Sequence, residues 1–344
     1  MKSFLISIYF AGFAGCGMQV ISGTENSQED FYSNFQDTST EESEQLEDPS
    51  GSTTEEDEES DEIEVEEGAE DSSAPVDEEP EVLADYFRPG PYAVTSQSNT
   101  VSVTDCSNMN YSVYSPTGVT APPVVVLGHG FARGSDVMSG WAEHLSTWGV
   151  EVLLPTLCHY NVFFGVDHEM NGQNMKELAM LHGSSETVYA GHSAGGLAAI
   201  IAAAIDTSSA GVLGLDTTDT EGVPGVSDFI GRGYAGSVSS YAFSIMGEPS
   251  SCNSENNGLE LFRMMDHYRA IKVNSADHCD FEIPTDFMCE ASCEGPTALF
   301  EDEEIREVIV SLGTAAILSL ANVADDGVLV WEEVALSSIA QEIE

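Results

Sequence analysis

A five-residue turn at 191–195, Gly-His-Ser-Ala-Gly, constrains the fold of this chain more than any other feature of its sequence. The short apolar run 187–190 before it predicts a buried strand, and the small apolar residues of 197–205 after it predict a helix. Glycine at both ends of the turn permits a tight bend and a close approach of helix to strand. Ser193 is thereby expected at the tip of a strand–turn–helix unit, with its hydroxyl exposed.

Apolar runs that predict strands alternate along the chain with segments of helical spacing. Short runs rich in β-branched residues are typical of strands buried on both faces. Their alternation with helices favours the α/β class, with a mostly parallel central sheet and helices on both faces. The predicted strands are 92–103, 109–114, 124–127, 150–154, 187–190, 211–215, 241–246 and 268–273, and the predicted helices are 138–148, 171–181, 197–205, 259–267 and 305–320.

Acidic residues are concentrated in one segment that is too polar to form a core. The 344-residue chain has a formal net charge of −51, and residues 24–85 hold 26 of its 60 acidic residues but neither Lys nor Arg. Such a segment repels itself and has little apolar surface to bury, so we expect residues 16–85 to be a disordered acidic tether. A globular domain is expected at 86–322, followed by a C-terminal extension at 323–344, either a small strand with an amphipathic helix or a frayed tail. The scarcity of basic residues argues against a nucleic-acid partner.

The N-terminus has the pattern of a targeting segment. Lys2 precedes a short apolar run, 4–14, which is too short to predict a membrane span. The run leads into Phe-Ala-Gly-Cys at 13–16, which resembles the lipobox of bacterial lipoproteins. This resemblance implies a signal peptide at 1–15, a lipid on Cys16, and an exported protein anchored to the membrane of the bacterial cell envelope. Ordinary signal cleavage near residues 15–17, giving a secreted protein, is the alternative.

Six cysteines remain when Cys16 is set aside, and all six lie in the expected globular domain. An even number in an exported protein suggests disulfides, although the sequence alone leaves the pairing open. Cys289 and Cys293 have the spacing of half a zinc site, but no second pair lies at suitable spacing with a nearby histidine. We therefore expect no metal.

A serine at the tip of such a turn needs a general base to act as a nucleophile. Two histidines follow Ser193 in the chain, His267 and His278. His267 ends a predicted surface helix, whereas His278 lies in the loop after the predicted strand 268–273. Because the carboxyl ends of parallel strands meet at one edge of a sheet, His278 is the predicted base.

The base in turn needs an acid that orients it, and two carboxylates are candidates. Asp216 directly follows the first predicted strand after Ser193, and Glu248 follows the next one. We expect Asp216 to be the acid and keep Glu248 as the alternative. Nearby Asp219 could serve as a cap or turn residue.

Attack by the serine on a carbonyl would create a negatively charged oxygen that needs hydrogen-bond donors. The backbone N–H of Ala194 begins the predicted helix, where the helix dipole adds favourable charge. A second donor is expected from the loop 128–132, and we choose the N–H of Phe131. His129 is expected to support this loop rather than to take part in the chemistry.

These motifs together resemble the chlorophyllase and polyester-hydrolase (cutinase-like) branch of the α/β-hydrolases, over roughly residues 89–322. The resemblance implies an α/β-hydrolase fold and a serine carboxylic-ester hydrolase with a Ser193–Asp216–His278 triad and a covalent acyl-enzyme. Such a reaction needs no cofactor, and we expect the protein to be a monomer. In chlorophyllases the acid follows the strand after the serine's helix, which favours Asp216, whereas polyester hydrolases keep Glu248 open. The matching segments are 90–94, 123–131, 148–155, 191–196, 214–216, and His278 with Asp280.

The resemblance also suggests how the cysteines pair. Some polyester hydrolases carry a disulfide near the loop of the catalytic histidine, which implies a Cys252–Cys279 bridge bracing the His278 loop. The remaining pairs would be Cys289–Cys293 and Cys106–Cys158.

Other functions remain open at this level. Among enzymes, the alternatives are a lipase or phospholipase-type acylhydrolase and a polyester hydrolase. Outside enzymes, they are a non-catalytic surface lipoprotein that retains the fold, and an adhesion or calcium-buffering protein whose functional part is the acidic tether.

Overall fold

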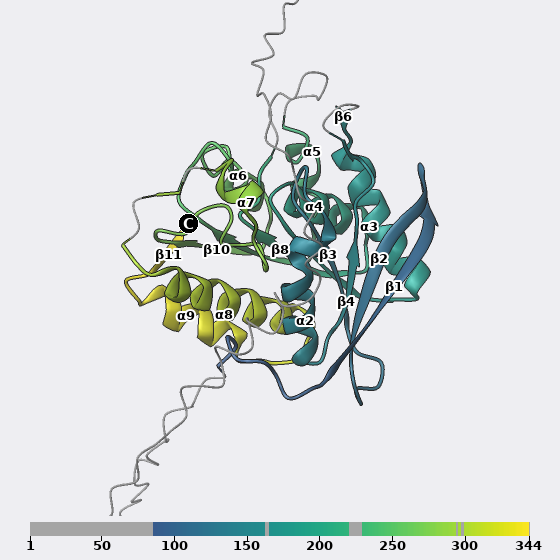
Figure 1. Cartoon of the computed structure of the whole chain (residues 1–344), viewed down its shortest axis with the longest axis horizontal. Coiled ribbons are helices and arrows are strands. Elements are labelled where there is room, and N and C mark those ends of the chain that lie inside the picture. The colour runs from purple at the N-terminus through teal and green to yellow at the C-terminus, as the bar shows by residue number, and fades with distance from the viewer. Residues whose placement is uncertain (1–84, 162–164, 220–228, 294, 297–298, 344) are drawn as a thin grey trace, which may run out of the picture. The chain divides into compact units, whose positions relative to one another are not determined.

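The computed structural model describes residues 85–161, 165–219, 229–293, 295–296 and 299–343. Its central feature is a nine-stranded sheet in the order β1-β2-β4-β3-β7-β8-β9-β10-β11 (Figure 1). The mixed α/β class with a mostly parallel sheet is thereby confirmed. The strands are β1 (Val94–Val103), β2 (Cys106–Pro116), β3 (Val124–Gly128), β4 (Glu151–Pro155), β7 (Thr187–His192), β8 (Ser209–Leu215), β9 (Tyr241–Met246), β10 (Tyr268–Val273) and β11 (Ala340–Ile343), and β5 (Tyr160–Asn161) and β6 (Gly165–Val166) form a separate pair.

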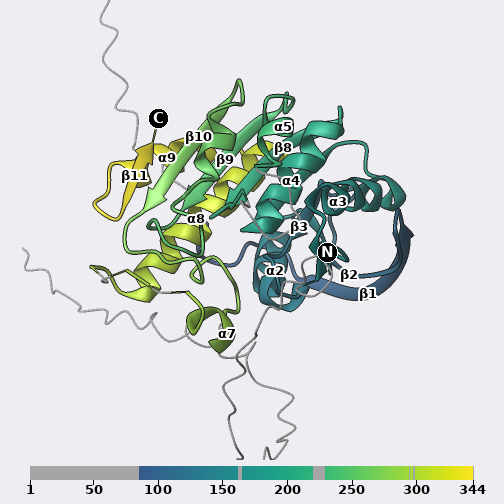
Figure 2. The ribbon, with the colours of Figure 1, turned by 90° about the horizontal axis from the view of Figure 1, so that it is seen from above.

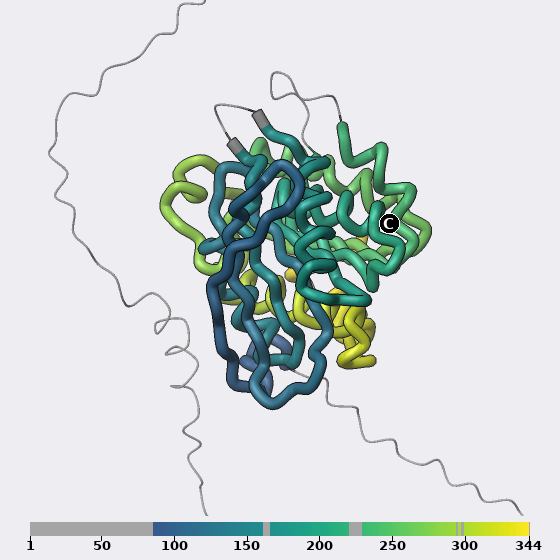
Figure 3. Tube along the Cα trace, turned by 90° about the vertical axis from the view of Figure 1, so that its right-hand side faces the viewer, coloured from purple at the N-terminus to yellow at the C-terminus, as the bar shows by residue number. Residues whose placement is uncertain are grey.

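Six neighbouring strands, from β4 through β3, β7, β8 and β9 to β10, are parallel to one another. Antiparallel strands complete the sheet on both sides. The β1–β2 hairpin joins it through β2 against β4 (Figure 3), and β11 joins it against β10. All five residues of β3 are buried, as expected for a β-branched run in the middle of a sheet covered on both faces.

Helices cover both faces of the sheet (Figures 1 and 2). Successive residues of β8 show the two layers, because Gly211 lies against Leu320 of α8 while Val212 packs in the apolar cluster that holds α4. On the face of α8, Gly313 packs closely against Trp141 of α2. The helices are η1 (Ser135–Met138), α2 (Ser139–Thr147), α3 (His168–His182), α4 (Ala194–Ile205), α5 (Arg232–Ala235), α6 (Leu259–Phe262), α7 (Phe287–Glu290), α8 (Asp302–Leu320) and α9 (Gly327–Ala335).

Two of the predicted helices show how far the local sequence determines where a helix begins and ends. Helix α3 contains the predicted range 171–181, because the Asp167 side chain accepts the N–H of Met170 at its start and Gly183 ends it at φ 92°. The predicted helix 259–267 is wrong in length, since α6 ends at Phe262. Strand β10 begins at Tyr268 beside β9, so the preceding residues must leave the helix to reach the sheet.

The C-terminal residues form a helix and a strand of the same sheet. Trp331 of α9 is fully buried, its indole N–H donates to the Leu312 carbonyl at 3.0 Å, and its ring centroid lies 4.7 Å from that of Phe243 in β9. Strand β11 then pairs with β10. Residues 327–343 therefore cover and extend the sheet, so the strand-and-helix expectation holds rather than the frayed tail.

Trp331→Ala is expected to lower the free energy of unfolding by about 3–5 kcal/mol, because it leaves a large cavity against β9. Denaturant or thermal unfolding would measure the change. Leu329→Ala on the same helix is the matched control, since Leu329 is 41% exposed and its loss should cost less than about 1 kcal/mol. A loss below about 1 kcal/mol for Trp331→Ala would show that the extension does not support the core.

The expected signal peptide, the lipid attachment site Cys16 and the acidic segment as far as residue 84 lie outside the described residues. Within the described ranges, no helix combines the length and the apolar character needed to cross a bilayer.

Candidate active site

The predicted site residues meet at the carboxyl edge of the parallel strands. Ser193 follows β7, Asp216 follows β8 and His278 lies in the loop after β10. Ser193 and His278 line one cavity of about 370 Å³, together with Phe131 and Ala194. The sheet therefore brings together residues that are 85 positions apart in sequence, from Ser193 to His278.

Ser193 occupies a backbone conformation that suits glycine. Its φ of 56° and ψ of −123° lie in a region that L-residues rarely adopt, and the residue is only 8% exposed. The flanking glycines make the turn possible: a Cβ on Gly191 would lie 2.3 Å from the Gly195 carbonyl group, and one on Gly195 would lie 2.5 Å from the Gly128 oxygen. The strained serine is thus held at the N-cap of α4 by surroundings that leave it no room to relax.

Two backbone N–H groups beside Ser193 are available as donors. Ala194 is the first residue of α4, so its N–H has no partner within the helix. Phe131 follows Gly130, on which a Cβ would lie 3.3 Å from the Ser193 Cβ. Neither N–H has an acceptor among the described residues. Such free donors next to a serine can bind an oxyanion.

Asp216 binds the ring of His278. The His278 Nδ1–H donates to Asp216 Oδ2 at 2.5 Å, and Asp216 Oδ1 accepts the N–H of Gly247 at 3.0 Å. The side-chain amide of Asn253 also donates to both carboxylate oxygens, at 3.2 and 3.3 Å. Because every partner is a donor, this 1% exposed carboxylate acts as an acceptor and fixes the tautomer of His278 with Nε2 free.

The described contacts contain no hydrogen bond between Ser193 and His278. Serine–base bonds are often long or poorly aligned until substrate binds. Both side chains line the same cavity, so the geometry is compatible with proton transfer from Ser193 Oγ to His278 Nε2.

Glu248, the alternative acid, has other partners. Its carboxylate pairs with Lys272 at 3.0 Å and accepts the N–H of Ser275 at 3.3 Å. The structure places Asp216 and not Glu248 against His278, and the Glu248 carboxylate binds the start of the His278 loop instead.

His129 supports the loop that carries Phe131, as expected. Its Nδ1–H donates to the Gly130 carbonyl at 2.9 Å and its Nε2 accepts the N–H of Leu157 at 2.9 Å. Burial lowers the pKa of His129 to about 4, so the ring stays neutral near pH 7 and keeps both bonds.

Asn253 and Tyr160 also contact this site, and sequence reasoning missed both. Asn253 binds Asp216, and the Tyr160 hydroxyl donates to the carbonyl of Ala194 at 2.5 Å. Neither residue belongs to a motif, because each reaches the site from a loop or a short strand far along the chain.

Two of the three disulfides brace the His278 loop, but with other partners than expected. The bridges are Cys252–Cys293 and Cys279–Cys289, so the predicted Cys252–Cys279 and Cys289–Cys293 pairs are wrong, while Cys106–Cys158 is confirmed. The short helix α7 decides this pairing: it buries Cys289 beside the Cys279 loop and leaves Cys293 one turn later to meet Cys252. The sulfur atoms of residues 279, 289 and 293 lie within 4.8 Å of one another, but as disulfides they offer no thiolate to a metal.

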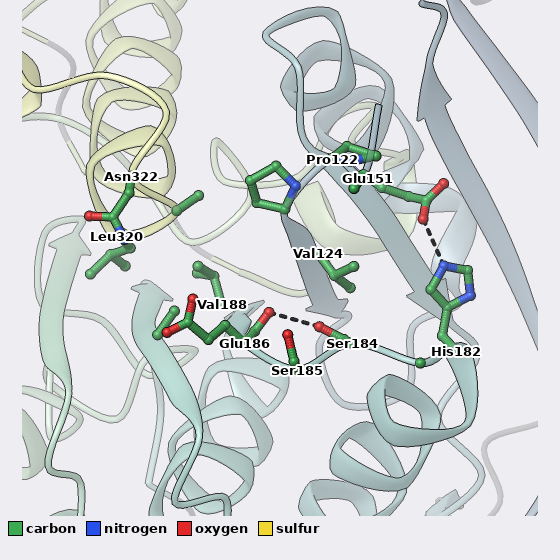
Figure 4. Close-up of a pocket in the computed structure, with 15 residues that line it drawn as sticks. Pro122, Val124, Glu151, His182, Ser184, Ser185, Glu186, Val188, Leu320 and Asn322 are labelled. Carbon is green, nitrogen blue, oxygen red and sulfur yellow. Dashed lines mark hydrogen bonds and ion pairs between the residues drawn. The ribbon is translucent and has the colours of Figure 1, made fainter. Parts of the chain in front are cut away.

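A second cavity, of about 410 Å³, lies at the opposite ends of the strands (Figure 4). Val124 lines it at the start of β3, whereas Gly128 ends that strand near Ser193. Two contacts join polar groups of its lining: His182 Nε2 and Glu151 Oε1 are 2.7 Å apart, and the Ser184 hydroxyl donates to the Glu186 carbonyl. This cavity does not belong to the candidate active site.

No protein-family model matches the sequence, and no curated protein matches it either. The strand order and the mostly parallel sheet are consistent with an α/β-hydrolase-like fold. Any functional assignment therefore depends on the geometry around Ser193.

Proposed function

We propose that this chain is a serine carboxylic-ester hydrolase. The observation that carries the proposal is the Asp216–His278 bond at the sheet edge where strained Ser193 lies beside two free N–H groups. Ser193 Oγ attacks the ester carbonyl while His278 Nε2 takes its proton, and His278 then gives that proton to the leaving alcohol. Water, deprotonated by His278, attacks the acyl-enzyme, and His278 returns that proton to Ser193 Oγ as the carboxylic acid is released.

The N–H groups of Ala194 and Phe131 would stabilise the negative oxygen of each tetrahedral intermediate. A single donor of this kind typically contributes about 3–4 kcal/mol to lowering the barrier. Asp216 stabilises the imidazolium that forms on His278, because it is buried and hydrogen-bonded to that ring.

A fluorophosphonate probe tests the proposal, because it reacts covalently with an activated serine. Protein made under oxidising conditions should be labelled at Ser193, with no labelling of Ser193→Ala. Folded protein that stays unlabelled would instead favour the non-catalytic surface lipoprotein.

The cavity favours an uncharged ester. Its lining includes Phe131, Met288 and the Cys252–Cys293 bridge. Arg133 is the one cation among its described lining residues, and its guanidinium already pairs with two carboxylates. Among the described lining residues, no Lys or Arg is therefore free to bind an anionic substrate, and the chain's net charge of −51 would repel one.

We expect p-nitrophenyl butyrate to have a kcat/KM at least about 10-fold above that of the p-nitrophenyl monoester of succinate, which carries a carboxylate at similar length. Measurement at about 0.05 and 0.5 M NaCl separates repulsion by the net charge of the protein from the lack of a free cation in the cavity. Salt screens the first effect but not the second. Equal or faster hydrolysis of the anionic ester would contradict this prediction.

The finer assignment, to the chlorophyllase and polyester-hydrolase branch, is likewise proposed on its motifs.

We also propose that the protein is exported and lipid-anchored through Cys16. Cys16→Ser is expected to move it from the membrane fraction to the soluble fraction, because a thioether-linked lipid would no longer form. A variant that stays with the membranes after a salt wash would contradict the anchor.

A further inference from the structure

An ion pair joins the two loops that carry the proposed oxyanion donor and the proposed base. Arg133 lies two residues after Phe131, and Glu282 lies four residues after His278. Arg133 Nε donates to Glu282 Oε1 at 2.8 Å, and its terminal nitrogen donates to Oε2 at 2.7 Å. Such a two-point contact fixes orientation as well as distance.

The carboxylate of the pair is buried and the guanidinium is largely covered, which restricts the geometry of the contact. The Glu282 side chain is 1% exposed and that of Arg133 is 14% exposed. Burial raises the pKa of Glu282, and the bonds to the Arg133 guanidinium oppose that rise. Two apolar side chains could hold the loops together at least as well, because a buried ion pair is costly to desolvate. Stability alone therefore does not explain why a charged pair stands here.

The surroundings of the pair connect it to the rest of the site. The same Arg133 nitrogen lies 2.8 Å from Asp286, the N-cap of α7. Glu282 Oε1 lies 3.7 Å from Nδ1 of buried His192, whose ring centroid is 4.5 Å from that of His278. A shift of Glu282 or Arg133 would thus move both the loop that carries Phe131 and the rings of His192 and His278.

We propose that Arg133 and Glu282 are positioning residues that hold the Phe131 N–H at the distance from Ser193 and His278 that oxyanion binding requires. This inference rests on the proposed ester hydrolysis. Arg133 acts through Phe131, because its guanidinium is directed at Glu282 and Asp286.

A residue that positions the oxyanion donor affects kcat in a way that a residue needed only for stability does not. An oxyanion donor must lie about 2.7–3.1 Å from an oxygen that becomes negative only in the transition state. A displacement of about 1 Å can cost on the order of 100-fold in rate. Loss of the pair should therefore lower kcat while KM stays nearly constant.

The test compares Arg133→Lys, and the double variant Arg133→Met with Glu282→Leu, in the full chain with p-nitrophenyl butyrate. The double variant removes both charges, so we expect its Tm to equal or exceed the wild-type value while kcat falls about 30- to 100-fold and KM changes less than about 2-fold. Arg133→Lys keeps the charge but not the two-point contact, so its kcat should fall about 10-fold with little change in KM.

Arg269→Met is the matched control. Arg269 has the same 14% exposure and pairs with Glu342 at 2.9 Å, but it lies in β10 outside the cavity lining, so its kcat should stay at the wild-type value. Wild-type kcat in the folded double variant would overturn the inference, as would a kcat that falls only where Tm falls. If the double variant does not fold, a wild-type kcat in Arg133→Lys overturns it equally. Wild-type protein that hydrolyses no ester and resists the fluorophosphonate would instead overturn the proposed function itself.

Discussion

Ser193→Gly is expected to abolish ester hydrolysis and, at the same time, to stabilise the protein. The hydroxyl is the proposed nucleophile, so kcat/KM should fall at least about 10³-fold. Its backbone at φ 56° is strained for any residue with a Cβ, at a cost of about 1–3 kcal/mol, and glycine removes that cost. Glycine also makes the unfolded chain more flexible, which lowers the free energy of unfolding by about 0.4–1 kcal/mol.

The net gain in stability should be about 1 kcal/mol, or a rise in Tm of about 2–4 °C for a domain of this size. Ser193→Ala should be equally inactive but without the gain, because alanine keeps the Cβ. Ala121→Gly is the matched control: Ala121 has a similar φ of 51° and is not among the residues that line the active-site cavity, so this change should raise stability while activity is kept. Full activity in either Ser193 variant would disprove the proposed nucleophile, and an unchanged Tm in Ser193→Gly would show that the turn stores no strain.

Asp216→Asn is expected to lower kcat by about 10³- to 10⁴-fold with the fold retained. Asparagine has an NH₂ group where aspartate has its second acceptor oxygen. An NH₂ group facing His278 cannot accept the Nδ1–H, so the histidine loses the tautomer that leaves Nε2 free. Asn tolerates the positive φ of 42° that Asp216 adopts, which keeps the backbone effect small. Steady-state kinetics with p-nitrophenyl butyrate and circular dichroism would measure the two properties.

Glu248→Gln is the matched control for the acid. Glu248 binds Lys272 rather than His278, so its loss should change kcat less than about 3-fold and affect mainly stability. If Glu248→Gln proved the more damaging change, the acid would have to be reassigned.

The α/β class was predictable from the sequence because strand and helix patterns depend on near neighbours in the chain. The run 187–190 lies within β7, and the turn at 191–195 follows because only glycine fits where α4 approaches β7. The meeting of Asp216 and His278 at one edge of the sheet was predictable for a similar reason: each follows a strand, and parallel strands end at a common edge.

Other features needed the tertiary structure. The pairing of Cys252 with Cys293 depends on where a single turn of helix, α7, places Cys289 and Cys293. Asn253 was unpredictable because nothing in its local sequence says that its loop folds back onto Asp216.

The sequence by itself determined the strand–turn–helix unit at Ser193. It also determined which segments form strands and which residues follow them. These features depend on backbone propensity and burial over a few residues. The partners of Cys252 and Cys279 and the Arg133–Glu282 contact were decided only by tertiary structure, as was the bond to His278 that distinguishes Asp216 from Glu248. Each depends on the distance between side chains from loops far apart in the chain, and those distances are set by the packing of the sheet and its helices.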